Sequence, residues 1–351
     1  MQNTLIEDYT LSVIIMNILF TCAGRRHYLL RYFKEVIGEG GNIVAADMQL
    51  SAPAFMAADV KIQVPHVYAD DYISKILEIC KEQKIDVLIS LNDLELPILA
   101  EHKDEFEIIG VKVIVSDPVV IDICFDKYKT AQFIESLGLK TLKTYINYNE
   151  AVAAINSGEL KFPLIIKPRW GSGSIGLEFV DDLEELEIVY KLDCKKVMKS
   201  VLATASTDDN FLLIQEVIKG PEYGLDIVND LKGEYRGVSV KQKLAMRSGE
   251  TDKAITVDNA KIRELGAAIG IALKHIGNLD CDVLERDGEF YVLELNPRFG
   301  GGYPFSHEAG VNTPMAIVAW AQGEDVSNEI FFPEYGRMFS KCDILLNVGE
   351  L

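Results

Sequence analysis

Positive charge is scarce in this sequence. Its 351 residues carry 35 lysines and arginines against 54 aspartates and glutamates, a formal net charge of −19 at pH 7. Nucleic acids and anionic membranes are bound through basic surfaces, so this imbalance argues against both as partners. Long apolar runs are also missing. The longest, residues 11–20, is interrupted by Ser12 and Asn17 and falls well short of the roughly 20 residues of a membrane span.

Cysteines with the spacing of metal sites or redox motifs are absent. The six cysteines are scattered without a CxxC motif, so we expect buried thiols in a reducing compartment and a cytoplasmic protein. No low-complexity tract occurs, and 48% hydrophobic with 25% charged residues is typical of a globular chain. Glu7 and Asp8 stand where a signal peptide needs positive charge. We therefore treat residues 1–15 as a dispensable extension, with Met16 as an alternative start.

The first third of the chain alternates apolar strands with helical patterns. Strands are predicted at residues 17–24, 42–47, 85–93 and 111–116, with helices at residues 25–40 and 72–83. This alternation predicts an α/β domain with a parallel sheet covered on both faces. Ligands bind such sheets at the carboxyl ends of the strands. Polar residues fall at those ends, namely Gly24–Arg26, Asp47 and Asn92–Glu95.

The remainder predicts an α+β arrangement. Its expected elements are a helix at 127–137 stopped by Gly138, two strands joined by a glycine-rich loop at 162–180, a helix at 181–190, antiparallel strands from 210, a helix at 262–276 and a hairpin at 279–296 turning at Asp287-Gly288. A chain of this length needs two or three lobes. We place the domain limits at 1–122, 123–205 and 206–325, with a tail at 326–351.

The glycine-rich loop is a candidate phosphate site. Gly171, Gly173 and Gly176 alternate with Ser172 and Ser174 between two apolar strands. Glycine lets the backbone approach a ligand closely, and successive N–H groups with serine hydroxyls can surround phosphate oxygens. The Walker pattern does not occur, since no GK[ST] follows. A flexible hairpin is the alternative. Against it, Lys167 lies inside the preceding apolar strand and needs an anion there.

The hairpin near the carboxyl terminus is a candidate metal site. Glu294 and Asn296 point to one face of a strand, and the turn brings Asp282 near Glu294. Two carboxylates and an amide oxygen suit Mg²⁺, and Arg298 would neutralise a phosphoryl group beside them. Asp280 points to the same face as Asp282 and is a rival ligand. An ordinary hairpin with a salt-bridged solvent face is the alternative.

A third candidate is the strand edge at Gln215, Glu216, Val217 and Ile218, which turns at Gly220-Pro221. Its free backbone groups could bind the edge of an adenine base, and Glu222 could accept from ribose hydroxyls. A plain surface turn is the alternative.

These three patterns, in this order, resemble the ATP-grasp superfamily. The chain is similar to one synthetase unit of the carbamoyl-phosphate synthase large chain, through IIKPRWGSGSIGL at residues 165–177 and YVLELNPRFGG at residues 291–301. The resemblance implies an ATP-grasp fold with a Rossmann-like pre-ATP-grasp domain, a small lid lobe and a larger lobe.

The resemblance also implies roles for particular residues. Lys129 and Lys167 would be the two nucleotide lysines and residues 171–176 the phosphate lid, with adenine held by the Glu216 and Ile218 backbones and ribose by Glu222. Asp282, Glu294 and Asn296 would bind magnesium. Arg298 would contact the acceptor or γ-phosphate, and Lys243 and Arg247 the phosphates or the substrate.

The reaction implied is carboxylate–amine ligation. ATP and two Mg²⁺ ions, which Mn²⁺ can replace, would convert a small carboxylate to an acyl phosphate that an amine then attacks. The chain has one synthetase unit where carbamoyl-phosphate synthase has two, and it lacks the glutamate-lysine hinge of biotin carboxylase. The substrates therefore stay open, and a homodimer is allowed. Two alternatives are a catalytically silent nucleotide-binding module and a dinucleotide-dependent enzyme. Asp47 suggests the latter, but the GxGxxG motif is missing.

Overall fold

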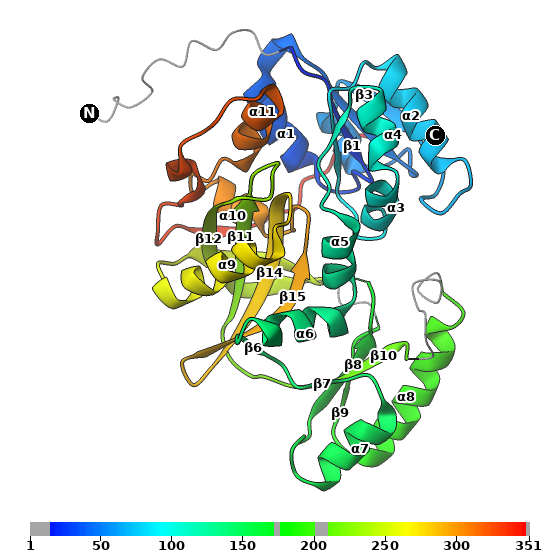
Figure 1. Cartoon of the computed structure of the whole chain (residues 1–351), viewed down its shortest axis with the longest axis vertical. Coiled ribbons are helices and arrows are strands. Elements are labelled where there is room, and N and C mark those ends of the chain that lie inside the picture. The colour runs from blue at the N-terminus through cyan, green and yellow to red at the C-terminus, as the bar shows by residue number, and fades with distance from the viewer. Residues whose placement is uncertain (1–14, 172–175, 201–209, 349–351) are drawn as a thin grey trace. The chain divides into compact units, whose positions relative to one another are not determined.

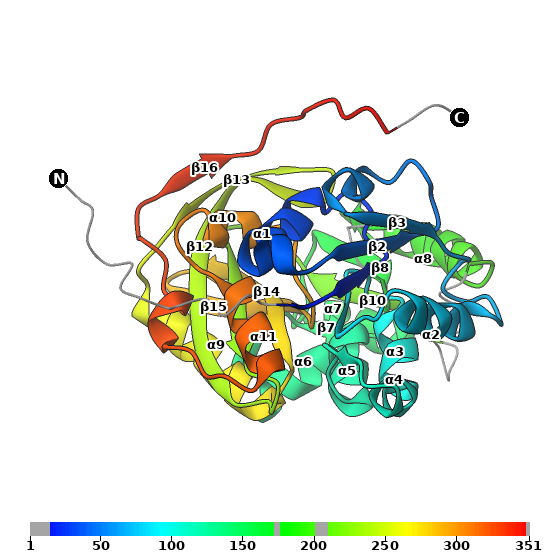
Figure 2. The same ribbon diagram turned by 90° about the horizontal axis from the view of Figure 1, so that it is seen from above.

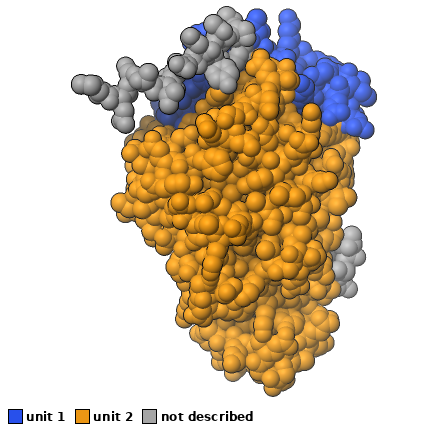
Figure 3. Space-filling view, turned by 60° about the vertical axis from the view of Figure 1, so that its left-hand side comes forward, with its two compact units in different colours: residues 1–91, 104–113, 346–351 blue, residues 92–103, 114–345 orange. Residues whose placement is uncertain are grey.

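The computed structural model describes residues 15–171, 176–200 and 210–348. The chain forms two compact units, the first from residues 1–91, 104–113 and 346–351 and the second from residues 92–103 and 114–345 (Figure 3). None of the helices in these described ranges has the length and apolar character of a membrane span. The domain limits predicted from the sequence stay a prediction.

The first unit contains the predicted parallel sheet. Its five strands run in the order β3-β2-β1-β4-β5, and β1 and β3 are labelled in Figure 1. All four residues of β1 are buried. Beyond the end of β1, Asp47 Oδ2 accepts from the backbone N–H of Gly24 at 2.8 Å. The strands are β1 (Ile18–Thr21), β2 (Ile43–Asp47), β3 (Val60–Gln63), β4 (Val87–Ser90) and β5 (Lys112–Val113), with α1 (His27–Ile37), α2 (Tyr72–Glu82) and most of α4 (Lys103–Ile108).

The second unit contains a small antiparallel sheet in the order β7-β10-β8-β9. Alternate residues of β8 and β10, such as Ile166 and Ile214, pack with α7 and α8 in a hydrophobic core. The residues between them, Lys167 and Gln215, therefore point to the opposite face of the sheet. The elements are β7 (Thr144–Tyr145), α7 (Tyr148–Asn156), β8 (Leu164–Pro168), β9 (Glu178–Val180), α8 (Leu183–Val197) and β10 (Leu212–Glu216).

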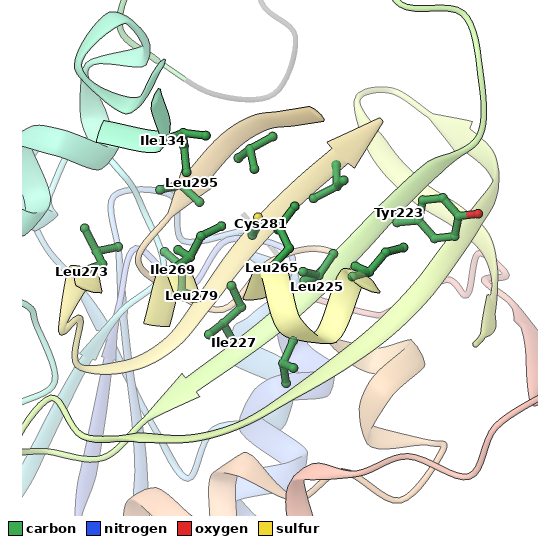
Figure 4. Close-up of a cluster of buried hydrophobic side chains, with 14 of the residues drawn as sticks. Ile134, Tyr223, Leu225, Ile227, Leu265, Ile269, Leu273, Leu279, Cys281 and Leu295 are labelled. Atoms are coloured by element: carbon green, nitrogen blue, oxygen red, sulfur yellow. The ribbon is translucent and has the colours of Figure 1, made fainter. Parts of the chain in front are cut away.

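The larger sheet of this unit has seven strands in the order β16-β13-β12-β11-β14-β15-β6. One face packs against α9 and α6 through a cluster that includes Leu225, Ile269, Cys281 and Leu295 (Figure 4). The strand β16 lies along β13 at one edge (Figure 2). The strands are β6 (Lys140–Thr141), β11 (Glu222–Asn229), β12 (Tyr235–Arg247), β13 (Glu250–Thr256), β14 (Gly277–Arg286), β15 (Glu289–Asn296) and β16 (Met338–Ser340).

The remaining helices include several that sequence patterns did not predict. They are short, and proline is the first or second residue of four of them. The helices are α3 (Leu96–Glu101), α5 (Pro118–Phe125), α6 (Lys127–Ser136), α9 (Ala260–Leu273), α10 (Tyr303–His307) and α11 (Thr313–Gln322), with 3₁₀ turns at Gly38–Gly40, Pro53–Ala57 and Asn328–Phe331.

Two predicted helix ends are wrong for local reasons. The helix α9 stops at Leu273, before the expected end at 276, because Lys274 adopts a left-handed conformation with φ of 55°. The helix α8 extends beyond residue 190 because Val197, almost two turns later, still packs into the core. The predicted turn at Asp287-Gly288 is confirmed, with positive φ at both residues. Three cysteines are buried as expected, and Cys342 is exposed.

A buried histidine makes stability depend on pH. His275 has no exposed surface, and its Nε2 lies 3.0 Å from the carbonyl oxygen of Ile227. Burial lowers its pKa to about 4. The pKa of His275 in the folded protein lies below its unfolded value of about 6.5. The stabilisation that comes from keeping this histidine neutral is therefore fully present above pH 6.5 and is lost as the pH falls towards the folded pKa.

We therefore expect unfolding free energy to fall by up to about 2 kcal/mol between pH 6.5 and 5 through this one group. Urea unfolding at pH 7 and pH 5 measures the drop, which His275→Gln should reduce. His66→Gln, at an exposed histidine, is the control. An equal drop in the His275 variant and the parent would contradict the assignment.

Candidate active site

The predicted oxygen ligands lie together on the face of the large sheet opposite its hydrophobic core. Asp282 pairs directly with Glu294 across the hairpin, and Asp280 pairs with Asn296. A β-bulge interrupts the register between Asp282 and Val283. It explains why Val292 and Leu295, three residues apart, both face the core. The bulge thereby places Glu294 opposite Asp282.

Lys243 occupies the space between two of these carboxylates. Its Nζ lies 2.6 Å from Asp282 Oδ1 and 2.7 Å from Glu222 Oε1, and its side chain is 7% exposed. Burial lowers the pKa of the Lys243 ammonium, but the charges of Asp282, Glu222 and Asp280 outweigh it and hold the pKa well above its usual value. Burial raises the pKa of the Asp282 carboxyl to about 7, against the opposing effect of Lys243.

Arg298 is fixed between two further carboxylates. Its guanidinium donates to Asp93 Oδ2 at 2.8 Å and to Asp280 Oδ2 at 3.1 Å. Asp280, the rival metal ligand, is thus engaged by arginine. Gly300 permits this arrangement, since a Cβ there would come within 2.1 Å of the Asp280 carboxyl carbon. The predicted location of Arg298 next to the acidic hairpin agrees with the structure, although it follows β15 instead of extending it.

A second buried ion pair lies on the same face and was missed from the sequence. Lys241 Nζ lies 2.6 Å from Asp226 Oδ2, and neither side chain is more than 1% exposed. Ser306 Oγ also donates to Asp226, at 2.5 Å. The signal in the sequence is alternation: Lys241 and Lys243 interrupt β12 at a spacing of two, which places both on one face.

The structure places Lys129 away from the other candidate residues. Lys129 points to exposed Asp122, 2.7 Å away, and its side chain is 42% exposed. Lys127 instead lines a pocket together with Asp93, Glu294 and Asn296, and its Nζ donates to the carbonyl of Gly171. The two lysines are two residues apart on α6, so they point to different sides of the helix.

The pocket at Lys127 has about 330 Å³ of empty space, open solvent included. Polar residues form one part of its lining and apolar residues the other, the latter being Leu96, Ile121, Cys124, Phe125, Leu295 and Pro297.

Lys167 is buried and Lys127 is partly buried, and the two cations repel each other. Burial lowers the pKa of Lys167 to about 8, and the charge of Lys127 adds to this effect. Burial also lowers the pKa of Lys127, while Glu294, Asp93 and Asp126 oppose the shift. Two desolvated ammonium groups next to a carboxylate form a place where an anion would be stabilised.

A buried ion pair positions both lysines. Asp126 caps α6 by accepting from the N–H groups of Tyr128 and Lys129, and it also accepts two hydrogen bonds from Arg169, at 2.9 and 2.7 Å. The backbone N–H of Lys127 donates to the Arg169 carbonyl. Helix α6 and the end of β8 are therefore joined at the residues that carry the two cations.

The described part of the glycine-rich loop is consistent with a close backbone approach. Gly171 and Gly176 have φ values of 99° and 71°, which other residues rarely adopt. The predicted phosphate contacts Ser172, Gly173 and Ser174 lie outside the described residues.

Part of the predicted adenine edge is already hydrogen-bonded within the protein. The N–H of Glu216 donates to the Lys143 carbonyl, so only the carbonyl side of that residue remains to be offered. The Glu216 carboxylate pairs with Arg286 at 2.8 Å. Gln215 and Ile218 are buried next to it, and Val217 is partly buried.

Arg247 is not brought to the site. It binds Asp252 and Asp343 and is half exposed, because it stands at the end of β12 where the strand leaves the polar face.

The donor set fits a hard divalent cation. Asp282, Glu294 and Asn296 offer only oxygen, which Mg²⁺ prefers over softer ligands. Carboxylates also outnumber cations on this face, since Lys243 and Arg298 stand against Glu222, Asp280, Asp282 and Glu294. Among residues 15–171, 176–200 and 210–348, no three His, Cys, Asp or Glu side chains are arranged around a common metal position. Asp282 is turned to Lys243 instead.

Two family models match the chain. The model described as "ATP-grasp domain" matches residues 124–302, and one described as "PylC-like, N-terminal domain" matches residues 18–114. Among curated proteins, the carbamoyl phosphate synthase large chain of Methanosphaerula palustris is 26% identical over 296 residues, 81% of this chain and 26% of that protein. The Mesorhizobium japonicum large chain is 25% identical over 256 residues, 67% and 22% respectively. This chain thus spans about a quarter of the length of these relatives.

Solved structures show the same fold. Biotin carboxylase from Campylobacter jejuni superposes with a TM-score of 0.70 at 19% identity, covering 92% of this chain and 73% of that one. L-amino acid ligase from Bacillus licheniformis superposes with a TM-score of 0.67 at 20% identity, covering 92% of this chain and 79% of that one. The biotin carboxylase domain of Hydrogenobacter thermophilus 2-oxoglutarate carboxylase was solved with MgADP and bicarbonate. It superposes with a TM-score of 0.71 at 18% identity, covering 93% of this chain and 73% of that one.

The Asp126–Arg169 pair should dominate the stability of this region. Asp126→Asn keeps a capping oxygen but leaves a buried guanidinium without its carboxylate, which costs roughly 3–5 kcal/mol. Asp122→Asn removes an exposed partner of Lys129 and should cost no more than about 1 kcal/mol. Urea unfolding midpoints of the two variants measure the difference. Equal midpoints would show that the buried pair is not what joins α6 to β8.

Proposed function

Because this chain belongs to the ATP-grasp family, we propose that it is an ATP- and magnesium-dependent ligase. It would activate a small carboxylate as an acyl phosphate, which an amine then attacks. The observation that carries the proposal is the pairing of two desolvated lysines, Lys127 and Lys167, with the oxygen face of Asp282, Glu294 and Asn296. Cations and metal ligands on two sides of one space suit a bound triphosphate.

Lys127 and Lys167 would bind the nucleotide phosphates, Lys127 taking the role that the sequence suggested for Lys129. Asp282, Glu294 and Asn296 would hold two Mg²⁺ ions, which Mn²⁺ can replace. When bound, these ions supply charge neutralisation between the β- and γ-phosphates. The glycine-rich loop would shield the phosphates from water.

The bond changes balance without a covalent enzyme intermediate. A carboxylate oxygen attacks the γ-phosphorus and ADP leaves; an amine then attacks the acyl carbon and inorganic phosphate leaves. Arg298, held rigid by Asp93 and Asp280, stabilises charge at the transferred phosphoryl group or the acceptor. Lys243 can contribute the same way once it leaves its carboxylate partners.

The nucleoside would lie against the edge of the small sheet. The Glu216 carbonyl and the Ile218 N–H would bind the adenine edge, next to Gln215 and Val217. Glu222 would bind the ribose hydroxyls.

The choice of lysine can be tested directly. Lys127→Met should weaken ATP binding about tenfold to a hundredfold, because each charged hydrogen bond contributes roughly 1.5–3 kcal/mol. Lys129→Met is the matched control on the same helix and should change the affinity little. Calorimetric titration with a non-hydrolysable ATP analogue measures both. A loss confined to the Lys129 variant would restore the assignment made from the sequence.

The reaction itself is tested by ADP release against panels of carboxylates and amines, with and without Mg²⁺ or Mn²⁺. Glu294→Gln should lower the turnover on any positive pair by at least about a hundredfold, since metal-bound charge stabilisation supplies several kcal/mol. Glu289→Gln, at an exposed residue of the same hairpin, should keep full turnover. Nucleotide binding without metal-dependent ADP release from any pair would favour a catalytically silent module.

A further inference from the structure

Lys243 crosses a whole strand to reach its partner. It stands on β12 opposite Glu222 of β11, whereas Asp282 stands on β14, on the far side of β11. The residue of β11 opposite Asp282 is Gly224. Because Gly224 has no side chain, the aliphatic part of Lys243 can lie over it.

The contact at Gly224 is close. A Cβ at that position would lie 3.3 Å from Cε of Lys243 and 3.3 Å from Cε of Lys241. This spacing is tighter than ordinary van der Waals contact between carbon atoms. The glycine thus leaves a channel across β11 that leads the ammonium group to the metal-binding face.

The ammonium group sits where positive charge is needed most. It lies within 2.7 Å of both Glu222 and Asp282, and Glu294 stands directly opposite Asp282. Three carboxylates so close together, one of them buried and two partly buried, repel one another unless a cation lies among them. In the described conformation Lys243 supplies that cation.

We propose that Lys243 is a built-in counter-ion that competes with the divalent cation for Asp282. A carboxylate oxygen that receives the ammonium group at 2.6 Å cannot also bind a metal ion in the same direction, so the two states exclude each other. This inference rests on the proposed role of Asp282 as a metal ligand.

The competition has a consequence for the order of binding. Metal alone must displace a buried ammonium from Asp282 and leave it with Glu222 in place of its two carboxylate partners, which is unfavourable. Metal that arrives with a triphosphate brings anionic oxygens to which Lys243 can turn. Divalent cation and nucleotide should therefore bind cooperatively, and nucleotide-free protein should bind the cation weakly.

The test measures Mn²⁺ binding to the nucleotide-free protein by electron paramagnetic resonance, which detects free Mn²⁺. Lys243→Met should bind Mn²⁺ at least about tenfold more tightly than the parent, because the competing charge is gone. Lys253→Met, at an exposed lysine of the neighbouring strand β13, is the control and should leave the affinity unchanged. Unchanged or weaker binding by the Lys243 variant would overturn the proposal.

Thermal unfolding gives a second readout that needs no catalysis. Without divalent cation, Lys243→Met should melt at a lower temperature than the parent, since the carboxylates then lack a counter-ion. Saturating Mn²⁺ should raise its melting temperature more than that of the parent. An equal rise in both proteins would contradict the exchange of one cation for the other.

If Lys243→Met does not fold, Lys243→Gln replaces it. This change keeps a polar side chain that can hydrogen-bond to Glu222 and Asp282 and removes the positive charge. The proposal again expects tighter Mn²⁺ binding by the variant; unchanged or weaker binding would overturn it.

Failure of the counter-ion idea can be told from failure of the proposed function. Mn²⁺ that binds the parent with an ATP analogue but not Glu294→Gln would leave the metal site standing, whatever Lys243→Met does. Absence of Mn²⁺ binding in every variant, analogue included, would remove the metal site itself.

Discussion

The register of the β14–β15 hairpin is the constraint on which the site depends. A two-residue turn at Asp287-Gly288 starts the pairing, and a bulge beyond Val283 shifts it by one residue. Without that shift Leu293, and not Glu294, would stand opposite Asp282. The bulge therefore serves the core and the polar face together, because Val292 and Leu295 both stay buried while the oxygen ligands gather opposite them.

Buried charges on this face are held by one another. Arg298 joins Asp93 to Asp280, Lys241 is enclosed with Asp226 and Ser306, and Lys243 bridges Asp282 and Glu222. Each ion pair lost much of its hydration on folding, so each contributes little net stability but makes the removal of one partner expensive. Such a network fixes the direction of each side chain. A site that acts by positioning charge depends on fixed side-chain directions, so the network serves this purpose although it adds little to the stability of the fold.

The sequence predicted what periodicity and turn chemistry encode. Alternation of strands and helices predicted the parallel sheet, and Asp287-Gly288 predicted the hairpin that brings Asp282 to Glu294. The sequence could not show which of Lys127 and Lys129 faces the pocket. Both lie in one helical turn, and only the packing of α6 decides which of them turns inward. The expected position of Arg247 differs from the structure for a related reason. The strand pattern of β12 continues to Arg247, but the polar face of the sheet ends before it. The Asp126–Arg169 pair joins segments 43 residues apart, and no local pattern encodes it.

The pKa shifts of Lys127, Lys167 and Asp282 favour the binding of a charged ligand among these side chains. Burial lowers the pKa of Lys127 and Lys167 and raises that of Asp282, so desolvation works against the charged form on both sides. If these groups served only stability, the acidic and basic sets would be expected to pair with each other, as Asp126 and Arg169 do. Instead Asp282 is neutralised by Lys243, from its own sheet, and Lys167 is near another cation. Glu294 offsets the positive charge of the two lysines only in part, since their pKa values stay lowered. Desolvated charges of both signs around one site suit a ligand that carries both signs, as a metal–triphosphate complex does.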